Sequence, residues 1–132
     1  MADGSAQTED PLHSDAKTRA ARVRRESVRG VSVFVVETES VYPRQAAEIA
    51  SALKGGVLAA ERPKVLADLS GVRFVCSAFI GKLMEVFKES EQRGGTFKIC
   101  VKDERVAYTM KLVRLDALVE VGCDRAALIE SF

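Results

Sequence analysis

The chain has 132 residues and a mass of 14.4 kDa, which allows one domain of ordinary size. Its 47% hydrophobic and 30% charged residues are typical of a globular protein, and its formal net charge of +1 excludes the overall basic field of a nucleic-acid-binding domain. No apolar run reaches the roughly 18–20 residues of a membrane span, and the polar, acidic start excludes a secretory signal, so we expect neither nucleic acid nor membrane insertion.

The first third of the chain predicts a leader and a β-hairpin. Residues 1–18 have no apolar period, so we expect a flexible leader there and a single domain over 19–132. Residues 22–27 and the β-branched run 31–36 flank a turn at Arg29-Gly30, which indicates two paired strands. The basic stretch 17–25 could be a nucleic-acid arm, but a charged edge strand is the favoured interpretation.

Three segments in the middle of the chain predict helix, strand and helix. A helix is expected from Pro43 to the glycine pair at 55–56, which should end it. A buried strand is expected over 64–69, and residues 72–75 extend again after a turn. Ser77 is expected to cap a helix whose apolar residues recur at spacings of three and four and which stops at 94–95.

The remaining elements complete an alternating pattern of strands and helices. We expect a strand over 96–101, a helix capped by Asp103, a short strand over 118–121 and a last helix capped by Asp124. Strands that alternate with helices indicate an α/β domain with parallel strands and right-handed crossovers. We therefore expect a mixed sheet of four to five strands, with about four helices packed on one side.

Cysteine and histidine usage argues against an enzyme. The three cysteines, Cys76, Cys100 and Cys123, have no CxxC spacing, so neither a disulfide framework nor a zinc site is predicted and the compartment is expected to be the cytoplasm. The sole histidine is His13 in the leader, and no phosphate-binding glycine loop is present. We expect no catalysis, cofactor or metal; the alternative is a reactive Cys76, since a helix N-terminus lowers a thiol pKa.

The segment 65–81, VLADLSGVRFVCSAFIG, resembles the central motif of the STAS domain, a family that includes the bacterial anti-sigma factor antagonists. Arg93 to Ile99, Arg114 to Val119 and Asp124 to Ile129 are similar to later parts of the family pattern, so the resemblance covers residues 20–132. It departs at two places: the family's acid before the serine is Cys76 here, and the glycine two places after it is Phe79.

The resemblance implies a non-enzymatic anti-sigma factor antagonist that acts in transcription by partner switching. Its partner would be an anti-sigma factor that is also a serine kinase, and phosphorylation of Ser77 would release that partner. We expect the partner to contact the start of this helix, because a helix N-terminus presents free N–H groups and Phe79 adds apolar area there. The expected contact residues are Cys76, Ser77, Ala78, Phe79 and Lys82. The alternative is a STAS-like scaffold or assembly subunit without a phospho-switch, stressosome-like or transport-associated, and a homo-oligomer stays open.

Each of these residues also has a plain structural interpretation. Ser77 could be only a helix cap, and Cys76 a small half-buried residue at the end of a strand. Phe79 either folds over the core edge or lies exposed at the contact surface, where aromatic residues are enriched. Asp68 and Asp103 are expected to be a strand-end acid and a helix cap rather than a catalytic pair.

Overall fold

The computed structural model describes residues 16–132 and contains a five-stranded mixed sheet. Its strands are β1 (Val23–Val28), β2 (Val31–Val36), β4 (Lys64–Asp68), β6 (Thr96–Cys100) and β7 (Glu120–Gly122), in the spatial order β1-β2-β4-β6-β7. β1 runs antiparallel to β2, and the other neighbours are parallel. A second, two-stranded sheet pairs β3 (Ser40–Val41) with β5 (Phe74–Val75). The predicted α/β fold with a mixed sheet is confirmed.

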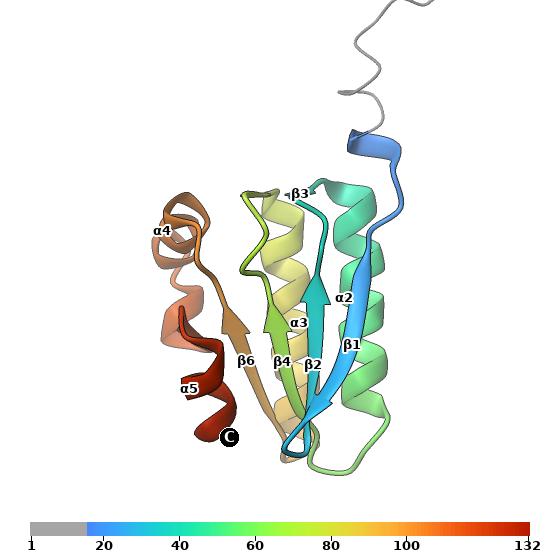
Figure 1. Cartoon of the computed structure of the whole chain (residues 1–132), viewed down its shortest axis with the longest axis vertical. Coiled ribbons are helices and arrows are strands. Elements are labelled where there is room, and N and C mark those ends of the chain that lie inside the picture. Colours follow the sequence, from blue (N-terminus) through green and yellow to red (C-terminus); the bar gives the residue numbers. More distant parts are fainter. Residues whose placement is uncertain (1–15) are drawn as a thin grey trace, which may run out of the picture.

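Helices cover both faces of the main sheet, so the expectation that they pack on one side is wrong. The helices are α2 (Pro43–Leu58), α3 (Ser77–Gln92), α4 (Glu104–Leu112) and α5 (Arg125–Glu130), with a 3-10 turn η1 (Leu115–Ala117). α2 and α3 lie behind the sheet in Figure 1, and α5 lies in front of it. The reason is visible in β4, where Val65 faces the larger core while Leu66 faces Leu128 and Ile129 of α5. A central parallel strand that is apolar on both faces needs cover on both.

The hairpin of β1 and β2 forms because its turn has the backbone that a two-residue connection requires. Val28 pairs with Val31, which leaves only Arg29 and Gly30 in the loop, at φ +52° and +79°. Two successive positive φ values match the right-handed twist of the flanking strands. β1 is an edge strand, as predicted.

The glycine pair at 55–56 does not end α2, which continues to Leu58. A β-carbon on Gly56 would lie 2.5 Å from Cζ of Phe34 in β2, whereas one on Gly55 would meet no atom within 4 Å. Gly56 therefore lets the helix approach the sheet closely, and the expected helix end is wrong. The second predicted end is confirmed, because α3 stops at Gln92 and Gly94 follows with φ +67°.

The parallel strands place three helix starts at one end of the molecule. β2, β4 and β6 all end at the upper edge in Figure 1, where α2, α3 and α4 begin. In open parallel sheets this edge is where binding sites form. The segment before β1 is tied to the same end, since the buried amide Nε2 of Gln45 donates to the carbonyls of Ala16 at 2.9 Å and Lys17 at 3.3 Å.

The expected leader falls mostly on residues 1–15, which lie outside the described residues, so its flexibility and the domain boundary stay predictions. Residues 16–18 are described and are helical. No helix within residues 16–132 is long and apolar enough to cross a membrane.

Candidate protein-interaction site

The loop that leads into α3 is held by backbone hydrogen bonds to the segment before α2. Arg73 N donates to Glu39 O at 2.7 Å, and Cys76 N donates to Val41 O at 3.0 Å. The β3–β5 ladder lies between these two bonds. The start of α3 is thus positioned against the start of α2 by main-chain contacts that do not depend on side-chain identity.

Ser77 is the exposed first residue of α3 and not its cap. The N-cap is Cys76, whose backbone is extended (φ −82°, ψ 162°) and whose side chain makes no capping hydrogen bond. The expected capping role of Ser77 is wrong, because the chain becomes helical one residue earlier than the serine would need. Its hydroxyl is accessible, and no acidic residue lies in the first turn of α3. A helix start of this kind favours an added negative charge.

Phe79 contributes no surface here, which corrects its inclusion among the contact residues. Its side chain is 0% exposed and lies in the main core, because position 79 turns toward the sheet with Ile80 and Leu83. Of the two placements left open for it, the core is the one found. The exposed aromatic residue is instead Phe74, at 45%, while its strand neighbour Val75 points inward. Alternation along a strand is the signal that could have identified Phe74.

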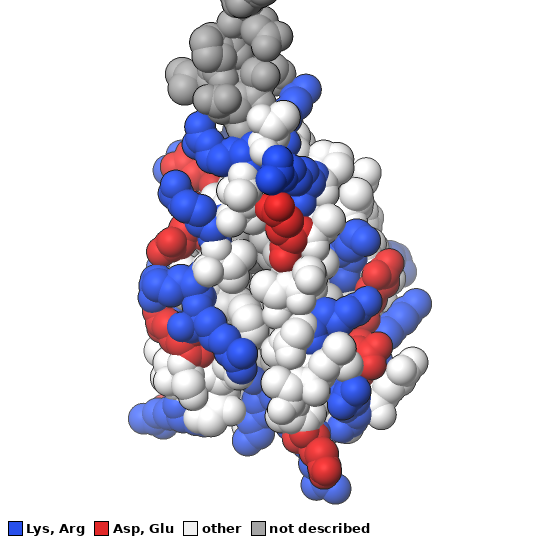
Figure 2. All heavy atoms as spheres, turned by 90° about the vertical axis from the view of Figure 1, so that its right-hand side faces the viewer, with Lys and Arg blue, Asp and Glu red and all other residues white. Residues whose placement is uncertain are grey.

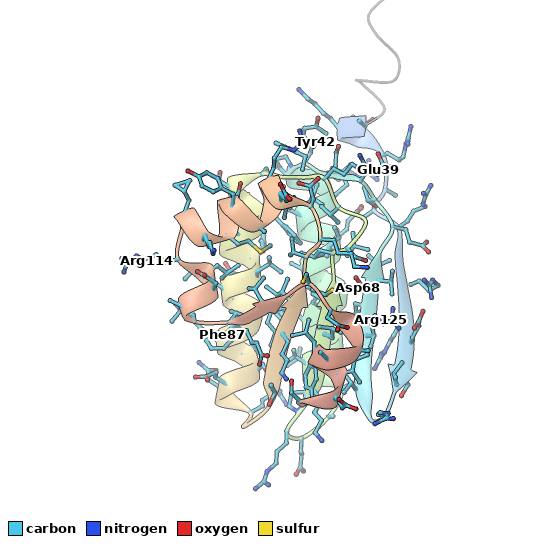
Figure 3. All side chains as sticks on the ribbon, turned by 60° about the vertical axis from the view of Figure 1, so that its left-hand side comes forward. Glu39, Tyr42, Asp68, Phe87, Arg114 and Arg125 are labelled. Carbon is cyan, nitrogen blue, oxygen red and sulfur yellow. The ribbon has the colours of Figure 1, made fainter. Side chains whose placement is uncertain are left out.

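Phe74 belongs to a small aromatic and basic cluster at this end of the molecule. Its ring centroid is 5.2 Å from that of Tyr42, and Nζ of Lys17 lies 5.8 Å from the Tyr42 centroid. Figure 3 shows Tyr42 and Glu39 together at this upper end. Within residues 16–132 no acidic side chain pairs with Arg73.

An open hollow of about 340 Å³ adjoins the cluster. It lies between the β3–β5 ladder and α4, and it is lined by Ser40, Arg73, Phe74, Val75, Arg105, Val106 and Thr109. Two arginines beside an exposed ring suit a partner segment that carries an apolar and an acidic side chain.

The other predicted contact residues lie near Ser77. Ala78 is exposed, Lys82 is partly exposed, and Cys76 is half-buried with its side chain packed on the main core. Lys82 lines a second hollow, of about 230 Å³, between α2 and α3. We call Phe74, Cys76, Ser77, Ala78 and Lys82 the α3 entry surface.

Asp68 and Asp103 have separate structural roles, as expected. Oδ2 of Asp68 is 3.1 Å from Nη1 of Arg125, which reaches from α5 to the end of β4 (Figure 3). Oδ1 of Asp103 accepts hydrogen bonds from the backbone N–H groups of Arg105 and Val106. These bonds, chiefly the one from Val106, lower the pKa of the Asp103 carboxyl. Asp103 and Asp124 cap their helices, which confirms both predicted caps. The ion pair of Arg125 was not expected, since nothing in the sequence pattern links α5 to β4.

Charge is mixed on the side of the molecule that carries β1 and α2. Figure 2 shows basic and acidic side chains interspersed on the side that carries β1 and α2. This side of the molecule therefore has no broad single-sign field of the kind that binds nucleic acid. In the described part of the chain no three His, Cys, Asp or Glu side chains come together as a metal site.

Comparisons with known proteins identify a domain family. Residues 22–126 match the STAS domain. An anti-sigma factor antagonist from Mycobacterium paratuberculosis has a similar structure, with a TM-score of 0.74 and 20% identity over 84% of this chain and 92% of that one. An anti-sigma-factor antagonist (STAS) domain protein from Planctomyces limnophilus matches with a TM-score of 0.71 and 23% identity, over 82% of this chain and 96% of that one. The Bacillus cell fate determinant SpoIIAA in its phosphorylated form matches with a TM-score of 0.62 and 11% identity, over 84% of this chain and 100% of that one. No curated protein sequence matches the chain.

Proposed function

This chain belongs to the STAS domain family, and on that basis we propose that it is an anti-sigma factor antagonist. Such a protein binds an anti-sigma factor in the cytoplasm and frees a sigma factor for transcription, without turnover or a cofactor. The observation that carries the proposal is the exposed Ser77 at the start of α3, in a loop held by the β3–β5 ladder. Similar structures from two organisms are named as antagonists of this kind, which supports the same role here.

The partner contacts the α3 entry surface. Phe74 supplies exposed apolar area, and the first turn of α3 supplies backbone N–H groups that a partner can bind. Arg73 and Arg105 beside the adjoining hollow favour an acidic partner segment. Such a surface needs no movement of the main chain, because its backbone is already held by hydrogen bonds.

Phosphorylation of Ser77 by a kinase partner would act as the switch. A phosphate adds about −1.5 to −2 charge, which the start of α3 can accommodate because that turn carries no acid. The same group would occupy the space that the partner needs and would repel its acidic side chains. SpoIIAA, which shares this fold, occurs in a phosphorylated form.

The second candidate is a scaffold that binds its partner constitutively. Cys76 is the observation that favours it, because a thiol replaces the acid that the family carries beside the serine. The Cys76 side chain makes no capping hydrogen bond and so does not organise the first turn. The two candidates share the binding surface and differ only in whether Ser77 is modified.

Calorimetric titration with each anti-sigma factor of the source organism tests both. One arm adds ATP and Mg²⁺ and maps phosphate by mass spectrometry; the other compares wild type with Ser77→Asp and Ser77→Ala. Ser27→Asp on the exposed edge strand β1 is the matched control. A switch predicts phosphate on Ser77 and at least tenfold weaker binding for Ser77→Asp only. Equal affinities without phosphate support the scaffold, and no binding to any anti-sigma factor refutes the antagonist role.

A further inference from the structure

The surface of α4 and η1 carries most of the exposed large apolar side chains in the described residues. Four of the six lie within residues 108–118: Tyr108 (64% exposed), Leu112 (61%), Val113 (50%) and Leu118 (50%). Tyr108 and Leu112 are four residues apart, so their side chains adjoin on one face of the helix, whereas at 100° per residue Val113 lies about 140° around the axis from Tyr108. Exposed apolar side chains that adjoin in this way often mark binding sites. We call Tyr108 and Leu112 the α4 patch. Neither belongs to the α3 entry surface.

Helical geometry places Tyr108 at the centre of the outward face of α4. Val106 and Met110 are buried against the core, and at 100° per residue Tyr108 points away from both. Glu104 and Lys111 flank Tyr108 on one side, seven residues or about two turns apart. Both are exposed, and within residues 16–132 neither has an ion-pair partner.

We propose that the α4 patch binds a second copy of this chain through antiparallel packing of two α4 helices. A two-fold axis that passes near Tyr108, perpendicular to both helices, brings the two Tyr108 rings together. The charged residues Glu104 and Lys111 of the two copies then lie along the same side of the helix pair. Glu104 of each copy then faces Lys111 of the other, which forms two ion pairs at once. Leu112 packs across the opposite side of the contact, beside the alkyl stem of Arg105 from the second copy.

The charges select a second copy over an unrelated partner. The side of α4 that carries Glu104 and Lys111 is acidic at one end and basic at the other, and antiparallel two-fold packing matches each end with its opposite. A partner helix whose charges all have one sign would be attracted at one end of α4 and repelled at the other. The apolar area of the α4 patch is well below the roughly 800 Å² per copy in a standard interface, so the dimer is weak, with Kd in the micromolar range.

Charge reversal with rescue tests the arrangement. The full chain is studied by sedimentation velocity over about 1–500 µM, where the wild type should pass from monomer to dimer. Tyr108→Glu should abolish the dimer, and Glu104→Lys or Lys111→Glu should each raise Kd about tenfold or more by placing like charges opposite each other. The double variant Glu104→Lys/Lys111→Glu should restore the dimer.

Rescue is decisive because both charges also suit the helix dipole of the monomer, so loss of stability alone could weaken the single variants. Circular dichroism checks that every variant is folded. Leu58→Glu, at an apolar residue 48% exposed at the end of α2, is the control and should leave Kd unchanged. A monomeric wild type at the highest concentration, a double variant no better than the singles, or an equal effect of Leu58→Glu would each overturn the proposal.

Discussion

Replacing Phe79 by alanine should destabilise the domain far more than replacing Phe74, although both rings lie near the start of α3. The Phe79 ring is 0% exposed in the main core, and removing such a ring costs about 3–5 kcal/mol, including the cavity it leaves. Phe74 is 45% exposed, so alanine there loses about half of a ring's burial and one contact with Tyr42. That sum is about 1–2 kcal/mol.

Urea unfolding followed by circular dichroism measures the difference. With a slope of about 1–3 kcal/mol per molar urea, Phe79→Ala should lower the midpoint by more than 1 M at an unchanged slope. Phe74→Ala should shift it much less and should weaken binding to the proposed anti-sigma factor partner by more than about 1 kcal/mol. A smaller loss of stability for Phe79→Ala than for Phe74→Ala would refute the placement of the two rings. Unchanged partner affinity for a folded Phe74→Ala would remove Phe74 from the α3 entry surface.

Four further outcomes follow from packing and charge. Gly55→Ala should stabilise the domain by about 0.5–1 kcal/mol through helix propensity, whereas Gly56→Ala should destabilise it by about 1–3 kcal/mol because the new methyl group collides with Phe34. Melting temperatures that shift in the same direction for both variants would contradict the close approach of α2 to the sheet. Burial, with a smaller effect of Asp68, raises the pKa of Cys100 to about 11, so native-state labelling should modify exposed Cys123 and leave Cys100 unmodified until unfolding. Because the unfolded thiol ionises first, Cys100 also makes stability fall as pH rises from about 9 to 11, which urea midpoints measured at both ends should detect. Arg125→Met should cost about 1–3 kcal/mol by leaving the buried Asp68 carboxylate without its cation, and unfolding midpoints recovered in Asp68→Asn/Arg125→Met would identify this cause.

Local patterns were sufficient for most elements. The hairpin at Arg29-Gly30, the start of α2 at Pro43 and the caps at Asp103 and Asp124 each depend on a few neighbouring residues, and each was predicted correctly. The order of strands and helices then restricts the topology to a mixed sheet with crossovers. The motif at 65–81 likewise pointed to the STAS domain family without any knowledge of the packing.

The candidate site could be predicted in position but not in detail. The resemblance brought attention to the start of α3, where Ser77 is indeed exposed, but it did not decide which aromatic residue is on the surface. Phe74 and Phe79 are the same residue type five positions apart. One lies on the outer side of a two-residue strand that pairs with β3, and the other lies on the inner side of a helix. Alternation along the strand indicates that Phe74 points outward, but the pairing of β5 with β3 that holds this strand is a long-range contact, which no local pattern could reveal.

The sequence by itself determined the type and order of most elements and indicated the family, because backbone preferences, caps and apolar periods act over a few residues. Only the tertiary structure decided that α2 passes through Gly56, that α5 covers the second face, and that Arg125 meets Asp68. A glycine can end a helix or admit a neighbouring ring, and the alternatives differ only in what lies opposite it, here Phe34. Such choices depend on close packing between segments distant in the chain, where one methyl group is enough to change the sign of the energy.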